Sequence, residues 1–170
     1  MEKNYVVMTD SSADLNPALE QELGVDIIPL SVNCGDRTFL DYPDEREIKT
    51  SEFYGMLRSG ANAKTAAANV ETFLTAMSRH LEQGKDVLYL GFSSGLSSTY
   101  SASEIAAQEL REHYPERKVL TVDTLCASMG QGLLVYLAAQ ERAKGKGIEE
   151  VRDWLETEKF HLCHWFTVED

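Results

Sequence analysis

The chain has 170 residues, of which 43% are hydrophobic and 26% are charged, as in an ordinary globular domain. Its 28 acidic residues outnumber its 16 basic residues, which gives a net charge of −12. This balance argues against a nucleic-acid partner and against a polybasic contact with anionic membranes, because both need clustered Lys and Arg.

The first third of the chain alternates apolar runs with helix-like segments, an arrangement typical of an α/β fold. Asn16 caps a predicted helix that has Pro17 in its first turn and Gly24 behind its end, the usual order at helix termini. Thr50 caps a second, shorter helix. The predicted strands are residues 5–9, 27–32 and 37–42, and the last two could pair as a hairpin across residues 33–36.

The rest of the chain continues this alternation. Residues 59–68 are predicted to be a polar, alanine-rich loop, and Asn69 caps the next helix, whose apolar residues recur every three or four positions. We therefore expect an α/β domain with a mainly parallel sheet flanked by helices. Further strands are predicted over residues 87–92, 119–122 and 161–168, and further helices over residues 97–113, 128–144 and 148–155.

Residues 91–103, which follow the strand at 87–92 and lead into a helix, are rich in serine. Ligands of open α/β sheets bind at the carboxyl ends of the strands, and hydroxyl and N–H groups beside a helix N-terminus suit an anion. Small residues also fill tight turns, and a serine is a common helix cap. The length of the serine-rich run favours a binding site over a simple turn.

The same run contains Gly91-Phe92-Ser93-Ser94-Gly95, which matches the GxSxG pattern of α/β-hydrolases. Ser93 would then be the nucleophile of a serine hydrolase, with Asp123 and either His161 or His164 as its partners. The chain is short for that fold, and the next helix is expected about four residues too late. We keep the hydrolase as the alternative hypothesis.

The spacing of the acidic residues and of the cysteines does not match that of a metal site. Asp10, Ser11 and Ser12, with Asp14 close behind, could form a metal site or a nucleophile, but no further carboxylate cluster or positioned lysine accompanies them. We interpret them as a strand-end turn whose side chains bind loop N–H groups. We predict no metal and no cofactor.

Cysteine content and hydropathy bear on location. Cys34, Cys126 and Cys163 form no CxxC pattern, and they are interpreted as reduced thiols. Residues 1–12 lack the long apolar run of a signal peptide, and no segment reaches the roughly 18 uninterrupted apolar residues of a membrane span. The sequence predicts a cytoplasmic protein without stable membrane insertion.

Several segments, in order along the chain, resemble the DegV family. The strongest is residues 92–100, Phe-Ser-Ser-Gly-Leu-Ser-Ser-Thr-Tyr, which is similar to the family's SSxLSGTY signature except that Ser98 replaces its glycine. The family's TSxPS loop reads Thr65-Ala66-Ala67-Ala68-Asn69 here, which keeps the threonine but loses the serine and proline. The other segments are Asp10-Ser11-Ser12-Ala13-Asp14-Leu15, Ile28-Pro29-Leu30, Phe53-Tyr54 with Leu57, Phe73, Val122-Asp123-Thr124, and Ser128-Met129-Gly130-Gln131-Gly132.

The resemblance implies a fatty-acid-binding protein and not an enzyme. Family members have two domains with a long-chain fatty acid between them, and they present the acyl carboxylate to a fatty acid kinase. Residues 1–170 would be the N-terminal α/β domain, with the C-terminal domain of the family absent from this chain. The resemblance places the carboxylate against the hydroxyls of Thr65, Ser93 and Ser94, and the choice between the two serines stays open.

Overall fold

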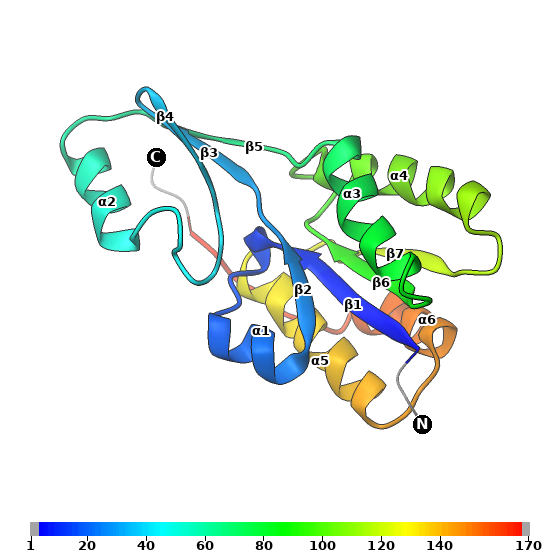
Figure 1. The fold of residues 1–170 in the computed structure, drawn as a ribbon. Helices are drawn as coiled ribbons and strands as arrows, with labels where there is room; N and C mark the ends of the chain where they lie inside the picture. The colour runs from blue at the N-terminus through cyan, green and yellow to red at the C-terminus, as the bar shows by residue number, and fades with distance from the viewer. Residues whose placement is uncertain (1–3, 168–170) are drawn as a thin grey trace.

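A four-stranded parallel sheet forms the centre of the protein, whose structure is a computed structural model that describes residues 4–167 (Figure 1). The strand order is β2-β1-β6-β7, and every neighbouring pair is parallel. This arrangement confirms the predicted α/β fold with a mainly parallel sheet. The strands are β1 (Tyr5–Asp10), β2 (Val25–Ile28), β6 (Asp86–Gly91) and β7 (Val119–Asp123).

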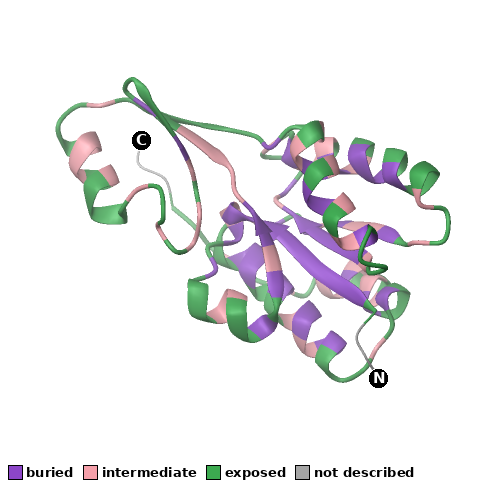
Figure 2. Ribbon diagram, in the orientation of Figure 1, coloured by how far each residue is buried: buried purple, intermediate pink, exposed green. Residues whose placement is uncertain are grey.

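Helices cover both faces of this sheet, because side chains of successive strand residues point to opposite faces. Val7 and Leu88 belong to the apolar cluster on one face, and Met8 and Tyr89 belong to the cluster on the other. Figure 2 shows the resulting buried layer along the central strands. The first face carries α1 (Pro17–Leu23), α5 (Met129–Ala143) and α6 (Ile148–Glu158), and the second carries α3 (Val70–Leu81) and α4 (Thr99–His113).

Residues 31–66 form a separate antiparallel unit, which we call the arm. It extends away from the central sheet (Figure 1). Its strand order is β4-β3-β5, with Val32 of the middle strand opposite Phe39 on one side and Thr65 on the other. The elements of the arm are β3 (Ser31–Cys34), β4 (Arg37–Leu40), α2 (Thr50–Arg58) and β5 (Ala63–Ala66).

Two of the three predicted helix N-caps discussed above lie at the predicted residue. The side chain of Asn16 accepts a hydrogen bond from the Leu19 N–H at 2.9 Å, and that of Asn69 accepts one from the Thr72 N–H at 2.9 Å, which confirms both caps. The predicted cap at Thr50 is wrong by one residue, since Lys49 occupies that position without a side-chain bond. Within residues 4–167, no helix combines the length and the apolar character needed to cross a membrane.

Three predictions about strands are wrong. The strand expected over residues 27–32 breaks at Pro29, which lacks the N–H of a ladder bond, and its two parts join different sheets. The loop expected over residues 59–68 contains β5, whose pairing with β3 is set by tertiary contacts and not by its alanine-rich composition. Residues 161–167 form no strand, and the predicted end of that strand, Val168, lies outside the described residues.

Candidate functional site

At the carboxyl ends of β1 and β6, the chain leaves the central sheet toward opposite faces. The crossover after β1 runs through α1 on one face, whereas the crossover after β6 runs through α4 on the other face. Open parallel sheets bind ligands at such a point, because the connections leave in opposite directions and a crevice opens between them. The two segments that flank it begin at Ser11 and Phe92.

A pocket of about 290 Å³ opens at this point, and we call it the edge pocket. Phe92 forms one part of its wall, and Thr65 of the arm forms another, so the structure brings the β5 threonine to the loop that leads to Ser93. The polar lining consists of hydroxyls from Ser11, Ser12, Thr65 and Ser128 and of carboxylates from Asp14 and Asp41.

The two candidate serines after β6 differ in exposure. Ser93 is buried, and its hydroxyl oxygen accepts a 3.3 Å hydrogen bond from the N–H of Gly95, which leaves the O–H free to donate. Ser94 is exposed, and its N–H donates to Oδ1 of Asp123 at 3.2 Å. Both side chains follow directly on Phe92, but neither belongs to the lining of the edge pocket.

The buried carboxylate of Asp10 holds the loop that begins at Phe92. Asp10 is fully buried at the end of β1, and its Oδ2 accepts hydrogen bonds from the Tyr89 hydroxyl at 2.6 Å, the Phe92 N–H at 3.2 Å and the Gln131 amide at 3.3 Å. Its Oδ1 accepts from the N–H and the hydroxyl of Ser12. The prediction of a strand-end turn is confirmed, and the same carboxylate also joins β1, β6 and α5. Burial, and then the charge of Asp10, raises the pKa of Tyr89 well above its ordinary value.

The rim of the edge pocket is acidic. Asp41 is exposed overall, and partial burial of its carboxyl group is the largest cause that raises its pKa. A hydrogen bond with the Ser11 side chain opposes the rise, and the charge of Asp14 adds to it. Asp14 is exposed, and its carboxylate accepts a hydrogen bond from the Ser128 hydroxyl. Among residues 4–167, no group of three or more His, Cys, Asp and Glu side chains could hold a metal ion.

A second, larger cavity of about 580 Å³ lies in the arm, and we call it the arm cavity. Its volume falls within the roughly 300–1,000 Å³ of small-molecule sites. It shares four lining residues with the edge pocket, so the two spaces are adjacent. Apolar side chains of the arm line much of it, among them Val32, Phe39, Leu40, Ile48 and Phe53.

The arrangement expected of a serine hydrolase is not formed in the part of the chain that the structure describes. The helix after Ser93 starts only at Thr99, whereas a nucleophile elbow needs a helix directly behind the serine. No imidazole bonds to Ser93 within residues 4–167. His161 lies beside Glu158, and His164 lies against Gly130 at the start of α5.

Sequence reasoning assigned no binding role to Asp41 or Ser128 of the edge pocket, and it assigned Ser11, Ser12 and Asp14 only to a strand-end turn. Asp41 lies just after β4, and Ser128 precedes α5, so neither is near the serine-rich run in sequence. Ser11 was assigned only to a turn, and its hydroxyl does accept the N–H of Leu30 at 3.1 Å. Asp41 belongs to no segment of the family resemblance, and Ser128 begins such a segment without being assigned a site role. Their place at the pocket depends on contacts between segments that are distant in the chain.

Comparison with known proteins identifies the chain's relatives. The model of a family described as "Uncharacterised protein, DegV family" matches residues 4–170. The chain belongs to the DegV family. A DegV domain-containing protein of Clostridium perfringens is 42% identical over 167 residues, which are 98% of this chain and 57% of the relative.

Solved DegV structures share the fold. A structure described as showing fatty acid binding by a DegV family protein of Thermus thermophilus has a TM-score of 0.80 and 34% identity, and the match covers 92% of this chain and 54% of that one. A DegV lipid-binding protein of Thermotoga maritima has a TM-score of 0.81 and 32% identity over 93% of this chain and 55% of that one. This DegV chain therefore spans little more than half the length of these relatives.

Proposed function

We propose that this DegV-family chain binds a long-chain fatty acid and is a binding protein and not an enzyme. The observation that supports the proposal most is the edge pocket, whose wall includes Thr65 of the arm and Phe92, the residue directly before Ser93 and Ser94, at the switch point of the sheet. The fatty-acid binding described for the Thermus thermophilus relative and the lipid binding described for the Thermotoga maritima relative support it.

The head group would bind to hydroxyls. A carboxylate that leaves water needs donors that converge on it, and donors to an ionised group form stronger hydrogen bonds than neutral pairs. Thr65, Ser93 and Ser94 are the proposed donors, and the buried position and free O–H of Ser93 favour it as the main contact of the two serines. The adjacent arm cavity offers apolar surface for the acyl chain.

Presentation of the bound carboxylate to a fatty acid kinase is the further step of this proposal. The edge pocket opens at the surface of the sheet edge, and Ser94 is exposed there, so a partner could reach a head group held at this place. The protein would work in the cytoplasm, where free thiols such as those of Cys34, Cys126 and Cys163 persist.

The test uses octanoate, which carries the same carboxylate and stays soluble, with the ¹⁵N-labelled chain. We expect octanoate to shift the amide signals of Thr65 and of residues 92–95 in a saturable manner, and octanol to shift them much less because it lacks the charge. Equal effects of both ligands would contradict a carboxylate site. Turnover of simple esters that is lost in Ser93→Ala would instead favour a hydrolase.

Removal of a single hydroxyl should weaken octanoate binding. Each of Thr65→Ala and Ser94→Ala removes one donor to a charged group, which is worth roughly 1.5–3 kcal/mol, or about 10-fold to 150-fold in affinity. Both residues are exposed, so the melting temperature should change little. Titration of each variant measures the loss, and Ser101→Ala is the matched control because Ser101 lies exposed on α4, away from both cavities. Unchanged affinity in the double variant would exclude these donors.

A further inference from the structure

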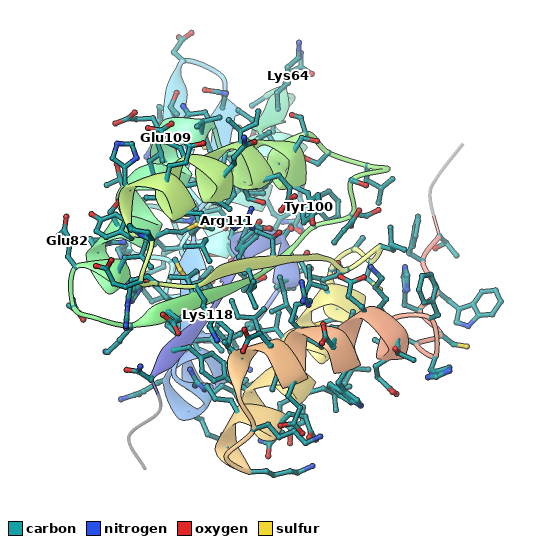
Figure 3. All side chains as sticks on the ribbon, turned by 90° about the vertical axis from the view of Figure 1, so that its right-hand side faces the viewer. Lys64, Glu82, Tyr100, Glu109, Arg111 and Lys118 are labelled. Atoms are coloured by element: carbon teal, nitrogen blue, oxygen red, sulfur yellow. The ribbon has the colours of Figure 1, made fainter. Side chains whose placement is uncertain are left out.

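Residues 92–97, which we call the serine loop, are bonded to residues 123–126, which follow the start of the turn after β7 and which we call the β7 loop. Figure 3 shows β7 between α4 and α6. The N–H of Ser93 donates to the carbonyl oxygen of Cys126 at 3.0 Å. The buried hydroxyl of Thr124 donates to the carbonyl oxygen at the end of β6 at 2.7 Å. The β7 loop therefore holds the backbone from which the two candidate serine side chains extend.

Asp123 bonds to the serine loop through its side chain. Its Oδ1 accepts the N–H of Ser94 at 3.2 Å and the N–H of Leu125 at 3.1 Å. The second bond closes a turn at Leu125, whose backbone is left-handed with a φ of 55°. One carboxylate oxygen thus joins the serine loop to a turn that it also stabilises.

The main chain of Asp123 is held by a buried cation. Lys159 follows α6 directly, and its Nζ donates to the Asp123 carbonyl oxygen at 3.0 Å. Only 8% of the Lys159 side chain is exposed, and its ammonium group also pairs with Glu156 at 2.7 Å, which offsets part of the cost of burying the charge. Asp123 is therefore fixed at its backbone as well as at its side chain.

This use of Asp123 differs from its role in the hydrolase hypothesis. The acid of a catalytic triad orients a histidine, whereas Oδ1 of Asp123 accepts two backbone N–H groups. Within residues 4–167, the Asp123 carboxylate bonds to no imidazole. The side chain that the GxSxG pattern would assign to catalysis instead holds the loop that carries the serines.

We propose that Asp123 is a positioning residue of the head-group site, because it fixes the Ser94 N–H and thereby the place of the Ser94 hydroxyl. The inference rests on the proposed function and extends it to a residue that does not itself touch the ligand. A hydroxyl on a loose loop must be ordered when the ligand binds, and this ordering costs free energy. Loss of the Asp123 acceptor should therefore weaken binding through Ser94.

Octanoate titrations of Asp123→Ala and Asp123→Asn separate the lost acceptor from the lost charge. Alanine removes the acceptor, so affinity should fall by about threefold to tenfold, which approaches the loss of one donor to a charged group. Asparagine keeps an acceptor oxygen that suits the same turn, and it removes a negative charge that repels the ligand. Asp123→Asn should therefore bind octanoate at least as tightly as the native chain.

Ser94→Ala provides the background that shows whether Asp123 acts through Ser94. Once the hydroxyl is absent, its place no longer matters, so Asp123→Ala should weaken octanoate binding little further in this background. The same loss of affinity in both backgrounds would overturn the positioning role, because Asp123 would then act on the site by another route.

Asp86→Ala is the matched control for a general loss of stability. Oδ1 of Asp86 accepts the N–H of Lys118 at 3.0 Å, and Lys118 lies directly before β7, at the other end of the strand from Asp123 (Figure 3). Like Asp123→Ala, this variant loses a carboxylate that holds a backbone N–H. It should be less stable than the native chain in urea but should keep the native octanoate affinity.

Hydrogen exchange of the Ser94 N–H tests the contact without a ligand. The exchange should be faster in Asp123→Ala than in the native chain and nearly native in Asp123→Asn. Native octanoate affinity and unchanged Ser94 exchange in Asp123→Ala would overturn the inference and leave the proposed site intact. A native chain that binds no octanoate would contradict the proposed function itself and, with it, the ligand role of Asp123.

Discussion

Replacement of Asp10 by alanine should lower the free energy of unfolding by about 3 kcal/mol or more. The substitution leaves the Tyr89 hydroxyl, the Phe92 N–H and one Gln131 N–H without their acceptor at a site that water does not reach. Each unpaired buried donor costs roughly 1–3 kcal/mol, and relief from burying the Asp10 charge offsets only part of that sum. The Phe92 loop should also lose its anchor, so octanoate binding should weaken with stability.

Urea unfolding measures the lowered free energy of unfolding. The Asp10→Asn variant separates the effect of the lost acceptor from the effect of the lost charge. Asparagine keeps one acceptor oxygen and nearly the same shape, so this variant should lose less stability than alanine. The amide signals of Phe92 and Ser93 should shift in both variants and should shift further in the alanine variant. A change of less than about 1 kcal/mol for Asp10→Ala would show that water or other groups satisfy these donors.

Gly132→Ala should destabilise the protein by about 2–3 kcal/mol, although alanine normally favours a helix. A Cβ atom at Gly132 would overlap the backbone carbonyl oxygen of Ala13, and it would lie 3.4 Å from the side chain of Leu15. A backbone oxygen cannot turn aside as a side chain can. Either α5 or the short 3-10 helix Ser11–Ala13 must therefore move, and this helix supplies part of the edge pocket.

The same substitution elsewhere provides the control. Gly55 lies inside α2, and a Cβ atom there would meet no atom within 4 Å. Gly55→Ala should therefore stabilise the protein by about 0.5–1 kcal/mol through helix propensity alone. Urea unfolding of both variants should give changes of opposite sign. A stabilised Gly132→Ala would mean that α5 can move away from Ala13 without loss of packing.

The central sheet and its helices could be predicted from the sequence because their signals are local. The buried run of β1 and the three-to-four spacing of α3 each report a burial pattern within one short segment. The Asn16 and Asn69 caps need only a neighbouring N–H two or three residues away. The family resemblance likewise depended on short segments in order, and it led to the fold and to Thr65, Ser93 and Ser94 as candidates.

The β3–β4 hairpin of the arm confirms the predicted pairing across residues 33–36, whereas β5 and the edge pocket were decided only by the tertiary structure. β5 is a strand because β3 supplies its hydrogen-bond partners. Its alanine-rich and polar composition does not predict pairing with a strand about thirty residues earlier in the chain. Asp41 and Ser128 reach the edge pocket because the base of the arm and the residues before α5 meet the segment that follows β1. Local sequence determines the helices and the strands of the central sheet, whereas β5 and the charge at the pocket depend on contacts between segments that are distant in the chain.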